Sequence, residues 1–129
     1  QDLDGIEAKL RERIKNKLLP QAQVELNFER GRPPLEAKPA SRALALHGQK
    51  IYTEIGKKIN VPDEPRGGGT DAAFAGLKTN NPVVEGFGLQ GFGAHSTNAE
   101  YIMIPSIEPR LYLAARMIMD IATGKAPLK

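Results

Sequence analysis

The sequence contains no cysteine, and only two of its 129 residues are histidine. The lack of cysteine excludes disulfides, thiolate zinc sites and thiol nucleophiles. No apolar run approaches the roughly 18–20 residues of a membrane span, and no signal peptide is visible. We therefore expect no membrane partner, while a cytoplasmic and a periplasmic location both stay open. The chain starts at Gln1 without an initiator methionine, so we expect it to belong to a longer polypeptide.

The charge of the chain is mildly basic and scattered, with a net value of +3. The basic residues between positions 9 and 17 are interrupted by an acid, Glu12, and no aromatic residues accompany them. Binding to nucleic acid usually requires a denser basic stripe or a set of stacking aromatic side chains. We therefore expect no nucleic-acid partner.

The first thirty residues predict a helix followed by a strand. Apolar residues recur at spacings of three and four over residues 2–19, and Pro20 ends the run. Residues 21–29 alternate between apolar and polar side chains, as in a half-buried strand. Nothing precedes this helix and strand to pair with them, so they indicate the tail of an α+β subdomain whose first strands lie outside the chain.

Arg30-Gly31-Arg32-Pro33-Pro34 ends the predicted strand, because proline cannot donate to a strand ladder. Arg32 precedes a proline and is therefore biased toward an extended backbone. Its guanidinium can bind a carboxylate through two parallel hydrogen bonds. The alternative is an ordinary surface arginine at a domain junction.

A second helix is predicted over residues 39–58. His47 lies on or beside its apolar face, where a packing role is favoured because no second metal ligand stands four residues away. A short strand over residues 83–88 and a last helix over about 107–123 follow later in the chain. We expect the charged residues of that last helix, Arg110, Arg116 and Asp120, to face water or to pair locally.

Three glycines precede a short predicted helix over residues 72–77, in the motif Gly67-Gly68-Gly69-Thr70-Asp71. Thr70 or Asp71 suits the N-cap of that helix. Glycine lets a ligand approach the backbone, and a helix N-terminus favours an anion. A carboxylate or amide oxygen fits better than a phosphate, because the Lys-Ser or Lys-Thr of a phosphate-binding loop is missing. The alternative is a plain flexible turn.

His95 stands in the loop after the short strand predicted over residues 83–88, and we interpret it as a metal ligand. Neutral imidazole is a common zinc ligand, and a hydrolytic zinc ion usually needs three protein ligands. The chain has no HExxH motif, no HxxEH motif and no adjacent pair of glutamates. The other ligands must therefore come from elsewhere if this site exists.

Several motifs together resemble the C-terminal part of the co-catalytic zinc metallopeptidases and deacylases, which include glutamate carboxypeptidase, acetylornithine deacetylase and succinyl-diaminopimelate desuccinylase. Arg30-Gly31-Arg32-Pro33 is similar to the carboxypeptidase G branch in particular. The resemblance extends over about residues 2–124. Its other motifs are Gly67-Gly68-Gly69-Thr70-Asp71-Ala72-Ala73, residues 88–96, Ala99-Glu100-Tyr101 and residues 109–116.

This resemblance implies an α/β fold in which the C-terminal part of a zinc-peptidase catalytic domain follows the last helix and strand of a ferredoxin-like lid or dimerisation domain. Residues 1–32 match the incomplete lid, and residues 33–129 match the incomplete catalytic domain. His95 matches a zinc ligand, Gly69 matches a backbone donor near the substrate carboxylate, and Arg32 matches a substrate-facing arginine.

The implied reaction is hydrolysis of an amide bond that releases a C-terminal amino acid, glutamate in the carboxypeptidase G branch, from a peptide or N-acyl substrate. Two zinc ions and a general-base glutamate carry it in this family. The glutamate and most metal ligands match positions upstream of this chain, so no catalytic residue is assigned within it. We expect the chain alone to be inactive and to bind zinc weakly if at all.

The implied partners are the missing N-terminal part of the same protein and, in the parent enzyme, a second copy of the subunit. The alternative to an enzyme portion is a non-catalytic folded module that pairs with its missing half or with itself, since unpaired strand edges favour such association. A third possibility is an anion-binding domain built on the glycine turn.

Overall fold

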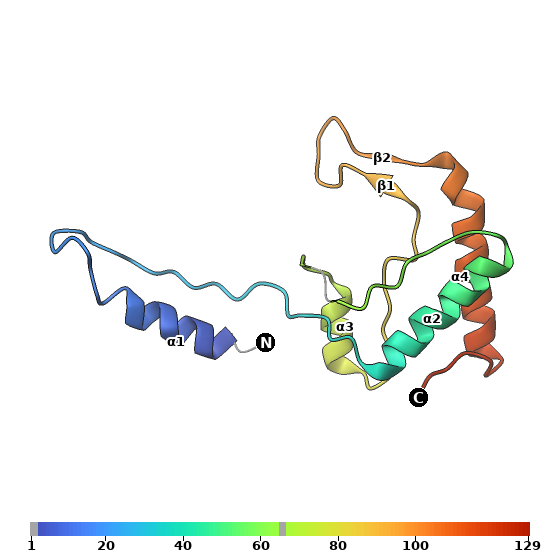
Figure 1. The fold of residues 1–129 in the computed structure, drawn as a ribbon, viewed down its shortest axis with the longest axis horizontal. Coiled ribbons are helices and arrows are strands. Elements are labelled where there is room, and N and C mark those ends of the chain that lie inside the picture. The colour runs from blue at the N-terminus through green and yellow to red at the C-terminus, as the bar shows by residue number, and fades with distance from the viewer. Residues whose placement is uncertain (1–2, 65–66) are drawn as a thin grey trace.

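The computed structural model describes residues 3–64 and 67–129 (Figure 1). Two short strands pair antiparallel, with Gly91 opposite Ile102 and Phe92 opposite Tyr101. The chain therefore combines helices with one small hairpin, and α1 and the extended segment after it lie apart from the other elements (Figure 1). The elements in chain order are α1 (Leu3–Arg13), α2 (Pro39–Glu54), α3 (Ala72–Lys78), β1 (Gly91–Phe92), β2 (Tyr101–Ile102), the 3-10 turn η1 (Ile104–Ser106) and α4 (Ile107–Ala122).

The core lies where α2 packs against α4. Leu113 and Ile51 are its most completely buried side chains, with 0% and 1% of their surface exposed. Burying an aliphatic side chain of this size contributes roughly 1.5–3 kcal/mol relative to leaving it in water. The remaining buried core residues are Leu44, Tyr52, Met117 and Ala126.

Gly48 allows a close contact on the inner face of α2. A Cβ added at this position would lie 2.8 Å from the ring of Phe87, which comes from the segment between α3 and β1. Phe87 packs against the α2–α4 core from there. The missing side chain of Gly48 therefore makes room for the ring.

His47 and Asp120 join α2 to α4 through a hydrogen bond of 2.8 Å between Nε2 and Oδ2. Both side chains are largely covered, with 18% and 8% of their surfaces exposed. The hydrogen bond from His47 holds the pKa of Asp120 below its usual value, and the charge of Arg116 acts in the same direction. His47 is thus satisfied in the interior, as its place beside the apolar face of the helix predicts.

The charged residues of α4 lie deeper than the sequence predicts. Arg110 and Asp120 are buried, so of the two predicted alternatives neither residue faces water, and Asp120 pairs with Arg116 on the same helix. Arg110 Nη1 donates to the carbonyl oxygen of Gly86 at 3.2 Å, and its guanidinium lies over the ring of Tyr52. Arg116 does pair locally, with Tyr112 and Asp120 on its own helix.

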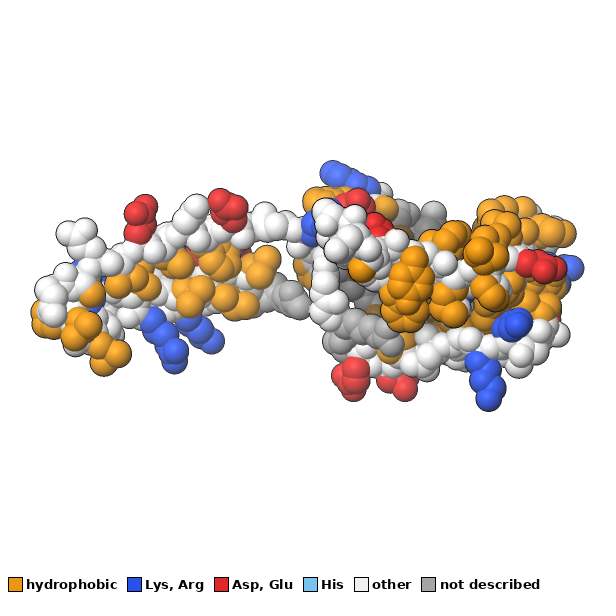
Figure 2. All heavy atoms as spheres, turned by 90° about the horizontal axis from the view of Figure 1, so that it is seen from above, with side chains coloured by type: hydrophobic (Ala, Val, Ile, Leu, Met, Phe, Trp, Pro, Cys, Tyr) orange, Lys and Arg blue, Asp and Glu red, His pale blue; other side chains and the backbone are white. Residues whose placement is uncertain are grey.

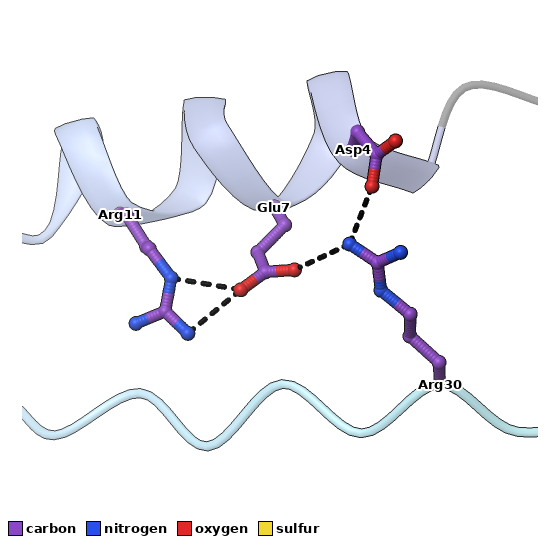
Figure 3. A network of polar contacts seen from close by, with 4 residues as sticks. All are labelled: Asp4, Glu7, Arg11 and Arg30. Carbon is purple, nitrogen blue, oxygen red and sulfur yellow. Dashed lines mark hydrogen bonds and ion pairs between the residues drawn. The ribbon is translucent and has the colours of Figure 1, made fainter.

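Arg30 ties the extended segment back to α1 (Figure 3). Its guanidinium binds the carboxylates of Asp4 and Glu7, and Arg11 binds Glu7 from one helical turn further along. The hydrogen bond from Arg30 lowers the pKa of Glu7 most, and the hydrogen bond from Arg11 lowers it further. None of the described residues of α1 is buried, so this exposed network is a main link between the helix and the segment that follows it.

The observed helices end earlier than the periodicity predicts. The helix predicted over residues 2–19 ends at Arg13, and position 2 lies outside the described residues. Short helices without tertiary packing are only marginally stable, which limits α1. The helix predicted over residues 39–58 ends at Glu54, because Gly56 adopts a φ of +69° and its N–H bonds to the carbonyl of Thr53.

The two predicted strands are not formed in the described part of the chain. Residues 21–29 run in an extended trace with no strand beside them, and residues 83–88 also lack a ladder (Figure 1). A strand needs hydrogen-bonding partners, and alternation within one segment does not provide them. The hairpin of β1 and β2 forms instead, from residues that the sequence analysis assigned to a loop.

Two leucines on α4 provide a test of the core. Leu113→Ala should lower the free energy of unfolding by about 2–5 kcal/mol, because it opens a cavity between α2 and α4. Leu111 is 61% exposed on the same helix, so Leu111→Ala should change it by less than about 0.5 kcal/mol. Urea unfolding of both variants measures the difference, and equal losses would contradict the assigned packing.

Candidate functional site

Arg32 meets the start of α3 across a long stretch of sequence. Its Nε–H donates to Oδ1 of Asp71 at 2.9 Å. Pro33 and Pro34 follow it, so the backbone is restrained on the side that leads into α2. Arg32 is 53% exposed and Asp71 is 85% exposed, so the pair lies at the surface.

The Arg32 side chain lies directly against Gly69. A Cβ added at Gly69 would stand 3.2 Å from Cδ of Arg32 and 3.6 Å from its Nη1. The structure therefore brings two of the three predicted site residues together. The aliphatic part of the Arg32 side chain is the group that lies against the backbone of this turn.

Thr70 organises the turn before α3. Its hydroxyl accepts the N–H of Ala72 at 3.1 Å, and its carbonyl accepts the N–H of Ala73. Asp71 occupies the N-cap position but makes no side-chain cap hydrogen bond. The carboxylate of Asp71 is thus left free to accept the hydrogen bond from Arg32.

His95 lies in the loop that joins β1 to β2. Its side chain is exposed and its φ is +68°, in the left-handed region that few residues other than glycine adopt. Next to it, Ser96 donates its N–H to the carbonyl of Gly93, and its hydroxyl accepts the N–H of Ala99. The loop therefore has an ordered backbone that presents the imidazole to solvent.

The side chain of His95 makes no hydrogen bond or ion pair with Arg32 or Gly69, all of which lie in the described part of the chain. Residues 3–64 and 67–129 contain no group of three or more His, Asp or Glu side chains that could hold a metal ion. One imidazole does not fit a zinc ion by itself, because hydrolytic zinc usually takes three protein ligands. The role of His95 as a zinc ligand stays a prediction.

A cavity of about 490 Å³ lies elsewhere, between residues 34–41, α3 and residues 79–83. Lys38 lines it and donates from Nζ to the carbonyl of Thr79 at 3.4 Å. None of the predicted site residues lines this cavity. It is therefore separate from the Arg32–Gly69 contact.

Comparison with known proteins bears on the motifs that surround these residues. Residues 4–120 match the model of peptidase family M20/M25/M40. The chain belongs to this family. It is also 45% identical to carboxypeptidase G2 from Pseudomonas sp. (strain RS-16) over 125 residues. The match includes 97% of this chain and 30% of the relative, so the chain spans less than a third of that protein's length.

Membership of the M20/M25/M40 peptidases confirms the resemblance that the motifs indicated. It leaves the individual roles of Arg32, Gly69 and His95 as predictions. The sequence analysis missed the pairing of Asp71 with Arg32 and considered Asp71 only as a helix cap. A signal was present, because Thr70 beside it can cap the helix equally well and leave the acid free.

The two histidines provide a matched test of whether His95 has a packing role. His95→Asn should leave the free energy of unfolding unchanged or raise it by up to about 1 kcal/mol, because asparagine tolerates positive φ better. His47→Asn should lower it clearly, because the shorter side chain removes the hydrogen bond that the buried Asp120 makes with the imidazole. Thermal and urea unfolding compare the two. A loss at His95 equal to that at His47 would show that the exposed imidazole supports the fold.

Proposed function

We propose that this chain is the C-terminal portion of a zinc-dependent metallopeptidase that hydrolyses an amide bond and releases a C-terminal amino acid, glutamate, from a peptide or N-acyl substrate. The observation that carries the proposal is the contact of Arg32 with Gly69 in a chain 45% identical to a protein named carboxypeptidase G2. Any C-terminal residue carries a carboxylate, and an arginine beside an open backbone turn is suited to bind one.

Arg32 and Gly69 would bind the carboxylate of the substrate together. The guanidinium offers N–H donors in a planar fork, and the N-terminus of α3 stands two residues after Thr70. Within the described residues, the backbone N–H of Gly69 donates to no acceptor. A carboxylate oxygen could therefore take both a charged and a neutral donor here.

His95 would supply one ligand to a zinc centre whose other ligands lie outside this chain. An exposed imidazole on an ordered loop is accessible for this role, and zinc would supply Lewis-acid chemistry in the assembled protein. Since a single histidine does not hold the metal, no step of the reaction is assigned to residues of this chain. The isolated chain should be inactive.

The surface of α4 that faces away from α2 favours a macromolecular partner. Leu111, Ile118 and Met119 are exposed there, and Figure 2 shows hydrophobic side chains gathered over this end of the molecule. A helix with apolar residues on several sides is usually buried on several sides. We propose that the remainder of the same protein covers this surface, and that residues 1–32 belong to the lid through which two parent subunits associate. No described helix has the length and apolar character to cross a bilayer.

A hybrid enzyme tests the proposal. Carboxypeptidase G2 in which the 125 matching residues are replaced by those of this chain should release glutamate from an N-acyl-glutamate in a zinc-dependent manner. His95→Asn in the hybrid should lower turnover by about 100-fold or more, because even residues that only support a metal ligand cost 10–100-fold. Thr97→Asn, at an exposed position in the same loop, should change little.

The isolated chain is the second arm of this experiment. It should show no turnover and no stoichiometric zinc by metal analysis. Turnover by the chain alone, or equal activity of the His95→Asn and Thr97→Asn hybrids, would contradict the proposed role. A non-catalytic module would give a folded hybrid without zinc-dependent hydrolysis.

A further inference from the structure

We infer that Asp71 is a positioning residue for Arg32: its carboxylate fixes the guanidinium beside the Gly69 turn, so that the terminal nitrogens are presented to the carboxylate of the substrate. This inference rests on the proposed role of Arg32. It adds a residue that acts through another side chain and does not itself touch the substrate.

The rigid geometry of arginine lets one hydrogen bond orient several donors at once. The guanidinium is planar, and its five N–H bonds point in fixed directions relative to one another. The hydrogen bond of 2.9 Å from Nε to Oδ1 of Asp71 uses one of these donors on the inner side of the fork. Fixing that donor also fixes the directions of the four N–H bonds on Nη1 and Nη2. In the described ranges of the chain, those four make no hydrogen bond or ion pair.

Two neighbours complete the arrangement. Gly69 has no side chain, and a Cβ there would press on the stem of Arg32 at 3.2 Å, so the arginine can lie flat across the turn. The hydroxyl of Thr70 accepts the first free N–H of α3. Asp71, at the N-cap position, therefore makes no cap hydrogen bond with its side chain. The carboxylate of Asp71 is therefore available for Arg32, because Thr70 accepts the hydrogen bond at the start of the helix.

The structural alternative is an ordinary surface ion pair. Such a pair contributes little to stability when it is this exposed, so loss of Asp71 should not unfold the chain. The chain contains a matched example of that ordinary kind. Asp63 is 82% exposed and pairs with Arg42, which is also bound to the carbonyl of Pro62. Asp63→Asn is therefore the control for Asp71→Asn.

The sign of the effect separates positioning from charge. Removing a carboxylate beside an anion site strengthens anion binding if simple electrostatics decides, because a repulsive charge is lost. Positioning predicts the opposite, since Arg32 then has to be ordered by the ligand at an entropic cost. The two explanations cannot both account for one measured change.

The test uses the 129-residue chain with ¹⁵N labelling and glutarate as the probe. Glutarate should shift the Nε–Hε signal of Arg32, which is assigned by its loss in Arg32→Gln. Asp71→Asn should weaken glutarate binding about three- to tenfold and speed the exchange of this Hε proton with solvent. Asp71→Glu, which keeps the carboxylate, should restore part of both, and Asp63→Asn should change neither. Backbone amide spectra verify that each variant keeps its fold.

Unchanged or tighter glutarate binding by Asp71→Asn would overturn the positioning role, as would an equal loss with Asp63→Asn. Failure of the proposed function has a different signature. If Arg32→Gln binds glutarate as well as the wild type does, or if the wild type gives no Arg32 shift, then Arg32 does not bind carboxylate and the role of Asp71 falls with it.

Discussion

The packing of α2 against α4 forms the core of the chain and positions the loops that follow these helices. Two buried serines at the starts of these helices connect the loops to this core through hydrogen bonds. The hydroxyl of Ser41 accepts the N–H of Val83 at 3.0 Å, and that of Ser106 accepts the N–H of Gln90 at 3.1 Å. The segment between α3 and β1 is thereby attached to one helix at each end. The core thus fixes the approach to the hairpin on one side and the exit from α3 on the other.

The candidate site is held by weaker forces than the core. Arg32 meets α3 through one exposed ion pair and through the space that Gly69 leaves open, and His95 stands on a separate hairpin with a left-handed backbone. Backbone strain at a non-glycine residue is a reason to examine function, since packing does not require it here. Arg32, Gly69, Asp71 and His95 are all exposed at the surface of the chain.

The helices could be predicted from the sequence, because their formation depends on residues close together in the chain. Apolar spacing predicted α2 and α4, the N-cap residues Thr70 and Asp71 predicted α3, and α4 ends at Ala122, one residue before its predicted end. The unpaired state of residues 21–29 and 83–88 could not be predicted, because strand formation depends on partners far along the chain. The burial of Asp120 and the pairing of Asp71 with Arg32 are also long-range, at separations of 73 and 39 residues.

The most direct test of this account is an NMR measurement of the contact between Arg32 and Gly69 in the wild-type chain. Nuclear Overhauser effects between the Hδ protons of Arg32 and the Hα protons of Gly69 should be strong, because the Cδ of the arginine lies against the face of the glycine. They should persist at moderate salt, since the contact depends on shape as well as charge. Their absence, with Arg32 moving freely in solvent, would contradict the claim that this chain contributes a preformed carboxylate site.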